Sequence, residues 1–306
     1  MARKLKGKPS KASQKHIKAA MFKEAVNRVQ KPVTPKPQQQ KKLQPKPKHE
    51  QPEQLNQAFI PFGPEDTVML VGEGDFSFAA SCLQQEYLQP SKLIITSFDN
   101  SANELALKYP HTFPKNNEYL KEKGVVIHYK IDGTDLVRSL KLKKHINSFP
   151  KLDFIVFNFP HTGRGMKDQD RNIRDHQLLV LGYFKSCVEV FKMLGWGTPK
   201  QRKSNLSEMN VLSTESQDKE PKIVLSVFEG EPYDSWNIKS LSKTLGLKVE
   251  RSGAFRWDLF KGYEHKRTNS EQQTTKVANE RKARIYVFEK FKKQIKKKKV
   301  DSDDED

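Results

Sequence analysis

The sequence of 306 residues has only 2 cysteines, Cys82 and Cys187, and no apolar run long enough to cross a membrane, which takes about 18 residues or more. Neither cysteine belongs to a Cys-x-x-Cys pair, and no Cys/His cluster has the spacing of zinc ligands. We therefore expect two buried, reduced thiols, no metal site and no membrane span. The first residues, MARKLKGKPS, lack the apolar middle of a secretory signal, which favours a protein of the cytosol or nucleus.

Apolar residues are also scarce, at 35%, whereas charged residues reach 30% and the formal net charge is +19. That charge is unevenly distributed. Residues 1–50 carry 15 Lys/Arg against 2 Asp/Glu, residues 290–300 carry 7 lysines, and residues 301–306 carry 5 acids. The remaining chain has 34 basic against 30 acidic residues, which is typical of an ordinary folded domain. The basic character thus belongs mostly to the tails.

Three segments are expected to lie outside the folded core. Residues 1–58 are rich in Lys, Gln and Pro, cannot bury an apolar core and are expected to form a disordered basic arm. Residues 198–221 form a polar, aperiodic insertion, and residues 291–306 form a charged C-terminal tail. Lysine neutralises phosphate without reading sequence, so the arm indicates nucleic-acid binding, nuclear import or both.

Between these segments, residues 59–290 alternate between strand-like and helix-like patterns. The strand-like segments are 67–71, 92–99, 124–132, 151–160, 222–229, 247–257 and 283–291. The helix-like segments are 76–88, 101–109, 134–141, 170–194 and 234–246. This alternation predicts an α/β domain with a mainly parallel sheet covered on both faces.

The first strand runs into the turn VMLVGEGDFSFAA at residues 68–80. Gly72 and Gly74 allow a tight turn and close approach of the backbone to a ligand. A dinucleotide fingerprint would place Ser77 at its third glycine and Asp75 beside a pyrophosphate, which the carboxylate would repel. S-adenosylmethionine carries a cationic sulfonium and ammonium instead, so the acidic turn favours this cofactor. A tight turn with no ligand stays open as an alternative.

Polar residues also follow the second and third strands. Asp99 lies 27 positions after Gly72, where an acid can accept both ribose hydroxyls, or else cap the next helix. Asp132 is a candidate for the adenine amino group with Thr134 beside it, and helix capping is an equal alternative. Glu73 faces either the methionine end of the cofactor or solvent.

The fourth strand ends in Asn158, Phe159, Pro160 and His161. Methyltransferases that modify planar nitrogens often carry Asn/Asp-Pro-Pro-aromatic at this point. By that comparison Asn158 orients a base edge, Phe159 stacks on the base, Pro160 stiffens the turn, and His161 hydrogen-bonds or relays a proton. The alternative is that Phe159 belongs to the core and His161 is a satisfied polar group.

Several motifs occur in an order that resembles a known family. They are VGEGDFSFA, SFDN, DGTDL, FNFPHTGRG, NIRDHQLLVLGYFKS, PYDSWNI and FKGYEHKRT. Together they cover about residues 59–290 and resemble the fungal 25S ribosomal RNA (uridine-N(3))-methyltransferase family. Two features depart from that pattern: the insertion at residues 198–221 is longer than expected, and Lys266 stands where the late motif often has Arg.

The resemblance implies a Rossmann-like, seven-stranded class I methyltransferase fold. It further implies S-adenosylmethionine-dependent methylation of N-3 of a uridine in large-subunit rRNA, in the nucleolus. By matching motif, Asp99 would hold the ribose, Asp132 would lie near the adenine, and residues 158–161 would shape the uracil pocket. The cofactor loop would comprise Gly72, Glu73, Gly74, Asp75 and Phe76.

Basic residues near the fourth strand and in the late motif are candidates for RNA contact, or are plain surface: Arg164, Lys167, Arg171, Arg174, His265, Lys266 and Arg267. Uracil N-3 lies on the pairing edge, so the target must be unpaired or flipped out. Its weakly acidic proton must leave, and His161 is the candidate base. We expect a monomer that acts on rRNA or a pre-ribosomal particle. Alternatives are a non-catalytic ribosome-assembly factor, an enzyme for another RNA, and a nicotinamide oxidoreductase.

Overall fold

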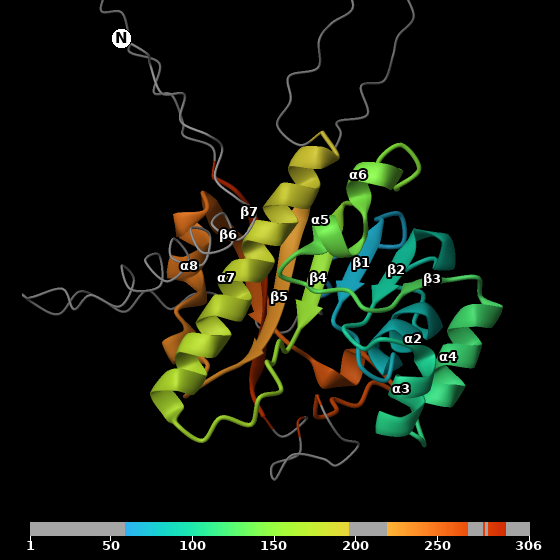
Figure 1. Cartoon of the computed structure of the whole chain (residues 1–306), viewed down its shortest axis with the longest axis horizontal. Helices are drawn as coiled ribbons and strands as arrows, with labels where there is room; N and C mark the ends of the chain where they lie inside the picture. The colour runs from blue at the N-terminus through green and yellow to red at the C-terminus, as the bar shows by residue number, and fades with distance from the viewer. Residues whose placement is uncertain (1–58, 196–218, 269–277, 279–280, 292–306) are drawn as a thin grey trace, which may run out of the picture.

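The computed structural model describes residues 59–195, 219–268, 278 and 281–291 (Figure 1). The expected basic arm, the C-terminal tail beyond Phe291 and nearly all of the polar insertion lie outside the described residues. One sheet of seven strands forms the centre of the domain, in the order β3-β2-β1-β4-β5-β7-β6. The strands are β1 (Val68–Val71), β2 (Leu93–Thr96), β3 (Val126–His128), β4 (Phe154–Asn158), β5 (Lys222–Phe228), β6 (Leu247–Ala254) and β7 (Ala283–Lys290).

Strand direction identifies the fold. Strands β1 to β5 pair in parallel, whereas β7 is antiparallel to both of its neighbours, β5 and β6. This order, with β7 inserted next to the last strand, is that of the Rossmann-like class I methyltransferases. The predicted seven-stranded α/β fold is confirmed.

Helices cover both faces of the sheet (Figure 1). They are α2 (Ser77–Gln84), α3 (Ala102–Lys108), α4 (Phe113–Glu122), α5 (Leu136–Ser139), α6 (Leu142–His145), α7 (Gln169–Met193) and α8 (Ile238–Thr244). Three short 3-10 helices are η2 (Pro90–Lys92), η3 (Asp234–Trp236) and η4 (Trp257–Leu259). Helix α4 lies in a stretch that the sequence patterns left unassigned, and β3 is much shorter than the predicted strand at 124–132.

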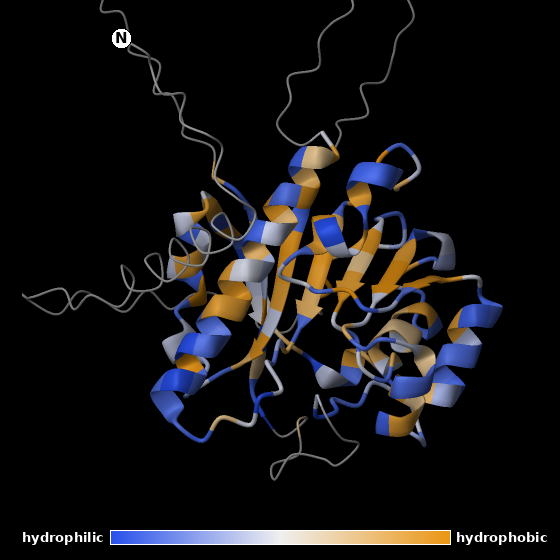
Figure 2. Cartoon of the chain, in the orientation of Figure 1, coloured by the Kyte–Doolittle hydropathy of each residue, from blue (hydrophilic) through white to orange (hydrophobic). Residues whose placement is uncertain are grey.

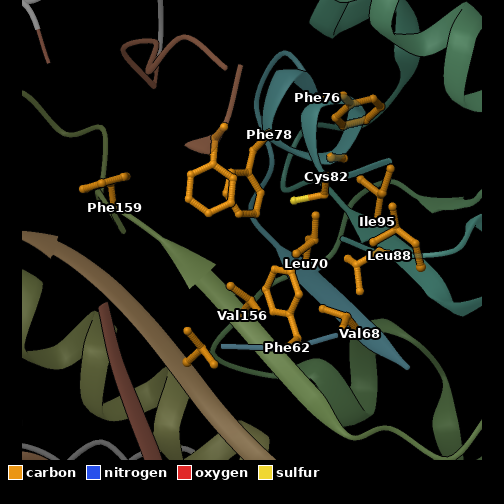
Figure 3. Packing of buried hydrophobic residues seen from close by; sticks show 14 of the residues in the cluster. Phe62, Val68, Leu70, Phe76, Phe78, Cys82, Leu88, Ile95, Val156 and Phe159 are labelled. Carbon is orange, nitrogen blue, oxygen red and sulfur yellow. The ribbon is translucent and has the colours of Figure 1, made fainter. Parts of the chain in front are cut away.

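Alternate residues of β1 enter two separate cores. Val68 and Leu70 pack with α2, α3 and α4, whereas Met69 and Val71 pack with α5, α6, α7 and α8. Figure 3 shows Leu70 in the first of these cores, near Cys82 of α2. The central strands are therefore apolar on both faces, as Figure 2 shows, and this is typical of a parallel sheet covered by helices.

Both cysteines are buried and free, one in each core, as expected for structural thiols. No helix in the described part of the chain combines the length and apolar character needed to cross a membrane.

Candidate active site

A cleft of about 1550 Å³ lies at the carboxyl ends of the parallel strands. Its volume exceeds the roughly 300–1000 Å³ of a typical small-ligand pocket, so it has room for a cofactor and a nucleotide together. Most of the predicted site residues line it: Gly72, Glu73, Gly74, Asp75, Asp99, Asp132, Thr134, Asn158, Phe159, Pro160, His161, Arg164, His265, Lys266 and Arg267. Phe76, Lys167, Arg171 and Arg174 are not among the lining residues.

The first turn needs its leading glycine. Gly72 has a left-handed φ of 71°, and a Cβ added there would lie 2.7 Å from the ring of Phe157. Asp75 shapes the rest of the turn, because its Oδ1 accepts hydrogen bonds from the backbone nitrogen (3.0 Å) and hydroxyl (2.6 Å) of Ser77. Phe76 packs its fully buried ring against Phe113, so its side chain belongs to the core and not to the cleft.

Two carboxyl groups are buried in this turn. Glu73 is only 8% exposed and Asp75 only 4%, which excludes the interpretation that Glu73 faces solvent. Burial, and next the charge of Asp75, raise the pKa of Glu73 to about 8. The Oδ2 of Asp75 is buried and has no hydrogen-bond partner within the described structure. Because a nearby cation would favour the charged form of Glu73, the turn suits a cationic ligand.

Asp99 follows β2 and forms an ion pair with Lys108 of α3. Ser101, rather than Asp99, caps this helix: its side chain accepts a hydrogen bond of 3.3 Å from the backbone nitrogen of Glu104. Asp99 is therefore not the helix cap that was its alternative role. Its carboxylate lines the cleft and has one cation beside it.

Asp132 and Thr134 form a compact turn after β3. Oδ1 of Asp132 accepts hydrogen bonds from the backbone nitrogen (2.8 Å) and hydroxyl (2.7 Å) of Thr134. Helix α7 packs closely on this turn at Gly182, where an added Cβ would lie 2.9 Å from Thr134. One carboxylate oxygen of Asp132 thus holds the local turn, and both residues also line the cleft.

Asn158 is the last residue of β4, and its Oδ1 accepts a hydrogen bond of 2.7 Å from the hydroxyl of Ser226 on β5. Phe159 next adopts a left-handed φ of 48°. Its ring is 8% exposed and packs against Phe228 and, in a stacked arrangement, Trp257 at centroid distances of 4.6 and 5.4 Å. The structure therefore buries most of this ring in an aromatic cluster at the cleft wall.

His161 accepts a hydrogen bond at Nδ1 from the backbone nitrogen of Gly163 (2.9 Å). Its ring centroid lies 4.8 Å from that of His176, a buried residue of α7 that stacks on Trp236. Burial, and next the neighbouring His176, lower the pKa of His161. The ring is therefore neutral at neutral pH. The helical periodicity of residues 170–194 did not indicate that His176 would contact His161, because it only places His176 within a long amphipathic helix.

His265 lies against Phe159 and Phe228, at centroid distances of 5.0 and 5.4 Å. Burial lowers the pKa of His265 to about 4, with smaller contributions from Arg281 and His161. Arg281 lies 3.6 Å from the centroid of the Phe228 ring and lines the same cleft. The sequence gave no signal for Arg281, which lies just before β7 and outside the motifs that carry the predicted site residues.

The late motif folds over the first turn. The hydroxyl oxygen of Ser77 lies 3.4 Å from both the backbone carbonyl oxygen and the backbone nitrogen of Glu264. Lys266 forms an ion pair of 2.7 Å with the Glu264 side chain. The side chain of Lys266 is only 9% exposed. Arg164 lines the cleft but is paired with Asp175 at 2.8 Å.

The remaining predicted basic residues lie in or just before the first turns of α7, away from the cleft lining: Lys167, Arg171 and Arg174. Among the described residues, no group of three or more His, Cys, Asp or Glu side chains is arranged to hold a metal ion.

Comparison with known proteins identifies the family of the chain. The chain is 44% identical over 275 residues to the 25S rRNA (uridine(2634)-N(3))-methyltransferase of Saccharomyces cerevisiae, covering 82% of each chain. It is 29% identical over 203 residues to an uncharacterized protein of Arabidopsis thaliana, covering 65% of this chain and 81% of that protein.

Solved structures are more distant. The crystal structure of the 16S rRNA methyltransferase KamB aligns with 73% of this chain and 88% of its own, at 9% identity and a TM-score of 0.34. The fold assignment therefore rests on strand order and direction. Residues 69–267 match the BMT5-like family, described as rRNA (uridine-N3-)-methyltransferase BTM5-like. With this match and the yeast relative, the chain belongs to the BMT5-like family of rRNA (uridine-N3-) methyltransferases.

Proposed function

We propose that this protein uses S-adenosylmethionine to methylate N-3 of a uridine in large-subunit (25S) rRNA during ribosome biogenesis. The observation that carries the proposal is the juxtaposition, in one cleft, of a buried acidic turn and the Asn-Phe-Pro-His segment at the end of β4. The turn suits a cationic cofactor, and the segment lies where a planar base would meet it.

The residues present fit S-adenosylmethionine. Glu73 and Asp75 are buried carboxyl groups, and Oδ2 of Asp75 has no partner within the described structure. A sulfonium or an ammonium beside them would favour the charged form of Glu73. A pyrophosphate would be repelled at the same place. We assign Asp99 to the ribose hydroxyls, and Asp132 with Thr134 to the adenine end.

The cofactor, when bound, supplies a methyl group already activated for transfer. The chain contributes binding and orientation. Asn158 and His161 border the space for the base, and the aromatic cluster around Phe159 forms a rigid wall behind them. Because N-3 lies on the pairing edge of uracil, the uridine must enter this space unpaired. Its N-3 proton then passes to solvent, since neutral His161 has its Nδ1 lone pair occupied by Gly163.

The proposed substrate and cellular location draw on the basic arm as well as on the cleft. We propose that rRNA within a pre-ribosomal particle is the substrate, that the basic arm at residues 1–58 adds sequence-independent affinity for it, and that the protein acts in the nucleolus. We further propose that the protein acts as a monomer. Arg267 and Arg281 border the cleft and are assigned to RNA contact.

The test is methyl transfer by the full chain from labelled S-adenosylmethionine to large-subunit rRNA that lacks 3-methyluridine. The digested RNA is analysed by mass spectrometry, and labelled 3-methyluridine is the expected product. Asn158→Ala should keep cofactor affinity and lose transfer, whereas Ser242→Ala, a buried hydroxyl deletion on α8, serves as the control. Cofactor binding without any labelled nucleoside from rRNA or pre-ribosomal particles would sink the proposal and favour a non-catalytic assembly factor.

A further inference from the structure

Ser226 lies directly behind the residue that borders the base space. Asn158 and Ser226 face each other in the parallel pairing of β4 and β5, and Ser226 is 1% exposed. Its hydroxyl donates a hydrogen bond of 2.7 Å to Oδ1 of Asn158. Ser226 does not line the cleft, whereas Asn158 does. A residue that is out of reach of any substrate thus holds the side chain that meets it.

This bond determines which end of the Asn158 amide stays available. With Oδ1 turned to Ser226, the hydroxyl hydrogen has an acceptor. The reversed amide would place the donor Nδ2 opposite this hydroxyl, which would then need another acceptor for its hydrogen. In this orientation Nδ2 of Asn158 is buried and has no hydrogen-bond partner within the described structure. A buried amide nitrogen of this kind requires a partner, and the described part of the chain does not provide one.

His161 is oriented in the same sense. Its Nδ1 accepts from the backbone nitrogen of Gly163 at 2.9 Å, so the neutral ring carries its hydrogen on Nε2. Together, Asn158 and His161 offer hydrogen-bond donors from one short segment at the end of β4. Their acceptor atoms are already engaged, Oδ1 of Asn158 by Ser226 and Nδ1 of His161 by Gly163.

Donors of this kind match one pyrimidine and not the other. N-3 of uracil is flanked by two carbonyl oxygens, both acceptors, whereas cytosine replaces one of them with an amino group, a donor. An amide nitrogen that faces an amino group leaves two donors opposed and unpaired, which is unfavourable. We infer that Ser226 fixes Asn158 as a hydrogen-bond donor to a uracil carbonyl oxygen, and that this pair determines the selection of uridine over cytidine.

The inference rests on the proposed function and deepens it. The test uses the full chain and an rRNA fragment that spans the uridine mapped by methyl transfer, beside the same fragment with cytidine at that position. Binding of both is measured by fluorescence anisotropy in the presence of S-adenosylhomocysteine, which prevents turnover. Wild type should bind the uridine fragment about tenfold or more tightly than the cytidine fragment. This ratio is expected because Asn158 forms a hydrogen bond with uracil, whereas with cytosine two donors face each other.

Asn158→Asp is the sharpest variant, because the carboxylate still accepts from Ser226 but offers an acceptor in place of the donor. It should lower the uridine-to-cytidine preference by about tenfold or more, and methyl transfer to uridine should fall with it. Ser226→Ala frees the amide to rotate and should lower the preference by a few-fold with cofactor affinity unchanged. Ser242→Ala, whose buried hydroxyl donates to a backbone carbonyl on α8, should leave the preference unchanged.

The two failures are distinguishable. If wild type makes no 3-methyluridine, the proposed function fails and the inference fails with it. If wild type makes 3-methyluridine while both variants, folded and cofactor-binding, keep the wild-type preference for uridine, only the inference is overturned. Should Asn158→Asp not fold, the ratio measured for Ser226→Ala decides alone.

Discussion

The hydroxyl of Tyr109 donates a hydrogen bond of 2.8 Å to the backbone carbonyl of Arg267 and lies 3.2 Å from that of Thr268. Tyr109 ends α3 and is 2% exposed, so this bond ties the first half of the sheet to the late motif across the cleft. The late segment at residues 263–268 therefore lies at the part of the cleft that we assign to the cofactor, as well as at the part assigned to RNA.

Tyr109→Phe removes that bond and keeps the ring. We expect the free energy of unfolding to fall by about 1 kcal/mol, because one buried hydrogen bond is lost, and the affinity for S-adenosylmethionine to fall several-fold. Tyr87→Phe is the matched control: its hydroxyl donates to the carbonyl of Leu259 at 2.9 Å, away from the cleft lining. It should show a similar loss of stability by urea denaturation with unchanged cofactor affinity. Equal affinity for both variants would contradict the structural role given to the late segment.

Gly72→Ala tests the first turn. The added Cβ would meet the ring of Phe157 at 2.7 Å, in a backbone with φ of 71°. Gly124→Ala has nearly the same φ, 72°, and no atom within 4 Å of the added Cβ. The control should therefore carry only the conformational cost of about 1–2 kcal/mol, and Gly72→Ala about 1–3 kcal/mol more from overpacking. Calorimetric cofactor binding should be lost in Gly72→Ala alone, and retention in both would contradict this account.

Glu73 predicts a pH dependence of cofactor affinity. Its pKa of about 8 leaves the carboxyl protonated at neutral pH in the free protein, and a bound cation favours the ionised form. Binding should therefore release a proton, and affinity should rise as pH increases from about 6 to about 8, by up to about tenfold per unit, then level off. Titration calorimetry in buffers of different ionisation enthalpy measures the proton release.

Glu73→Gln is the control for that dependence, since it keeps the shape and removes the titration. Its affinity should be weaker at high pH and should lack the rise below about 8 that is assigned to Glu73. A wild-type profile that is flat over this range would show that Glu73 does not sense the cofactor charge.

His265 predicts a pH dependence of stability. Its folded pKa of about 4 lies below the ordinary value of 6.5, so between these values the unfolded chain binds the proton and the folded protein does not. Stability contributed by neutral His265 is therefore present above pH 6.5 and is lost as pH falls toward 4, by about 2–3 kcal/mol. His265→Phe, which suits the surrounding rings, should lose less stability over this range in urea denaturation. His145→Asn, on the exposed end of α6, should behave like wild type.

Much of the fold was predictable because each strand has an apolar pattern of its own and polar residues follow it in the turn to the next helix. The acidic glycine turn and the Asn-Phe-Pro-His segment are local in sequence, so their presence in one cleft followed from parallel strands ending at one edge. Helix α4 was missed because its mean character is polar and only Phe113 and Leu120 are buried.

The partners of the site residues were not predictable in the same way. Ser226 and Arg281 contact residues that are distant in sequence and belong to none of the motifs. His176 lies inside one motif, but the motif gives no sign of its contact with His161. The left-handed backbone of Phe159, which turns its ring into the aromatic cluster, also depends on tertiary packing and not on residue preference. The assigned roles in cofactor, base and RNA binding stay predictions for the experiments above.

The bridge from Tyr109 to Arg267 also bears on how the protein is made. The ribosome finishes the first turn and α3 well before it synthesises the late motif, since 158 positions separate the two bonded residues. At roughly 5–20 residues per second, the nascent chain spends about 8–30 seconds without the segment that closes the cofactor side of the cleft. Nascent chains arrested before the late motif should therefore not retain the cofactor.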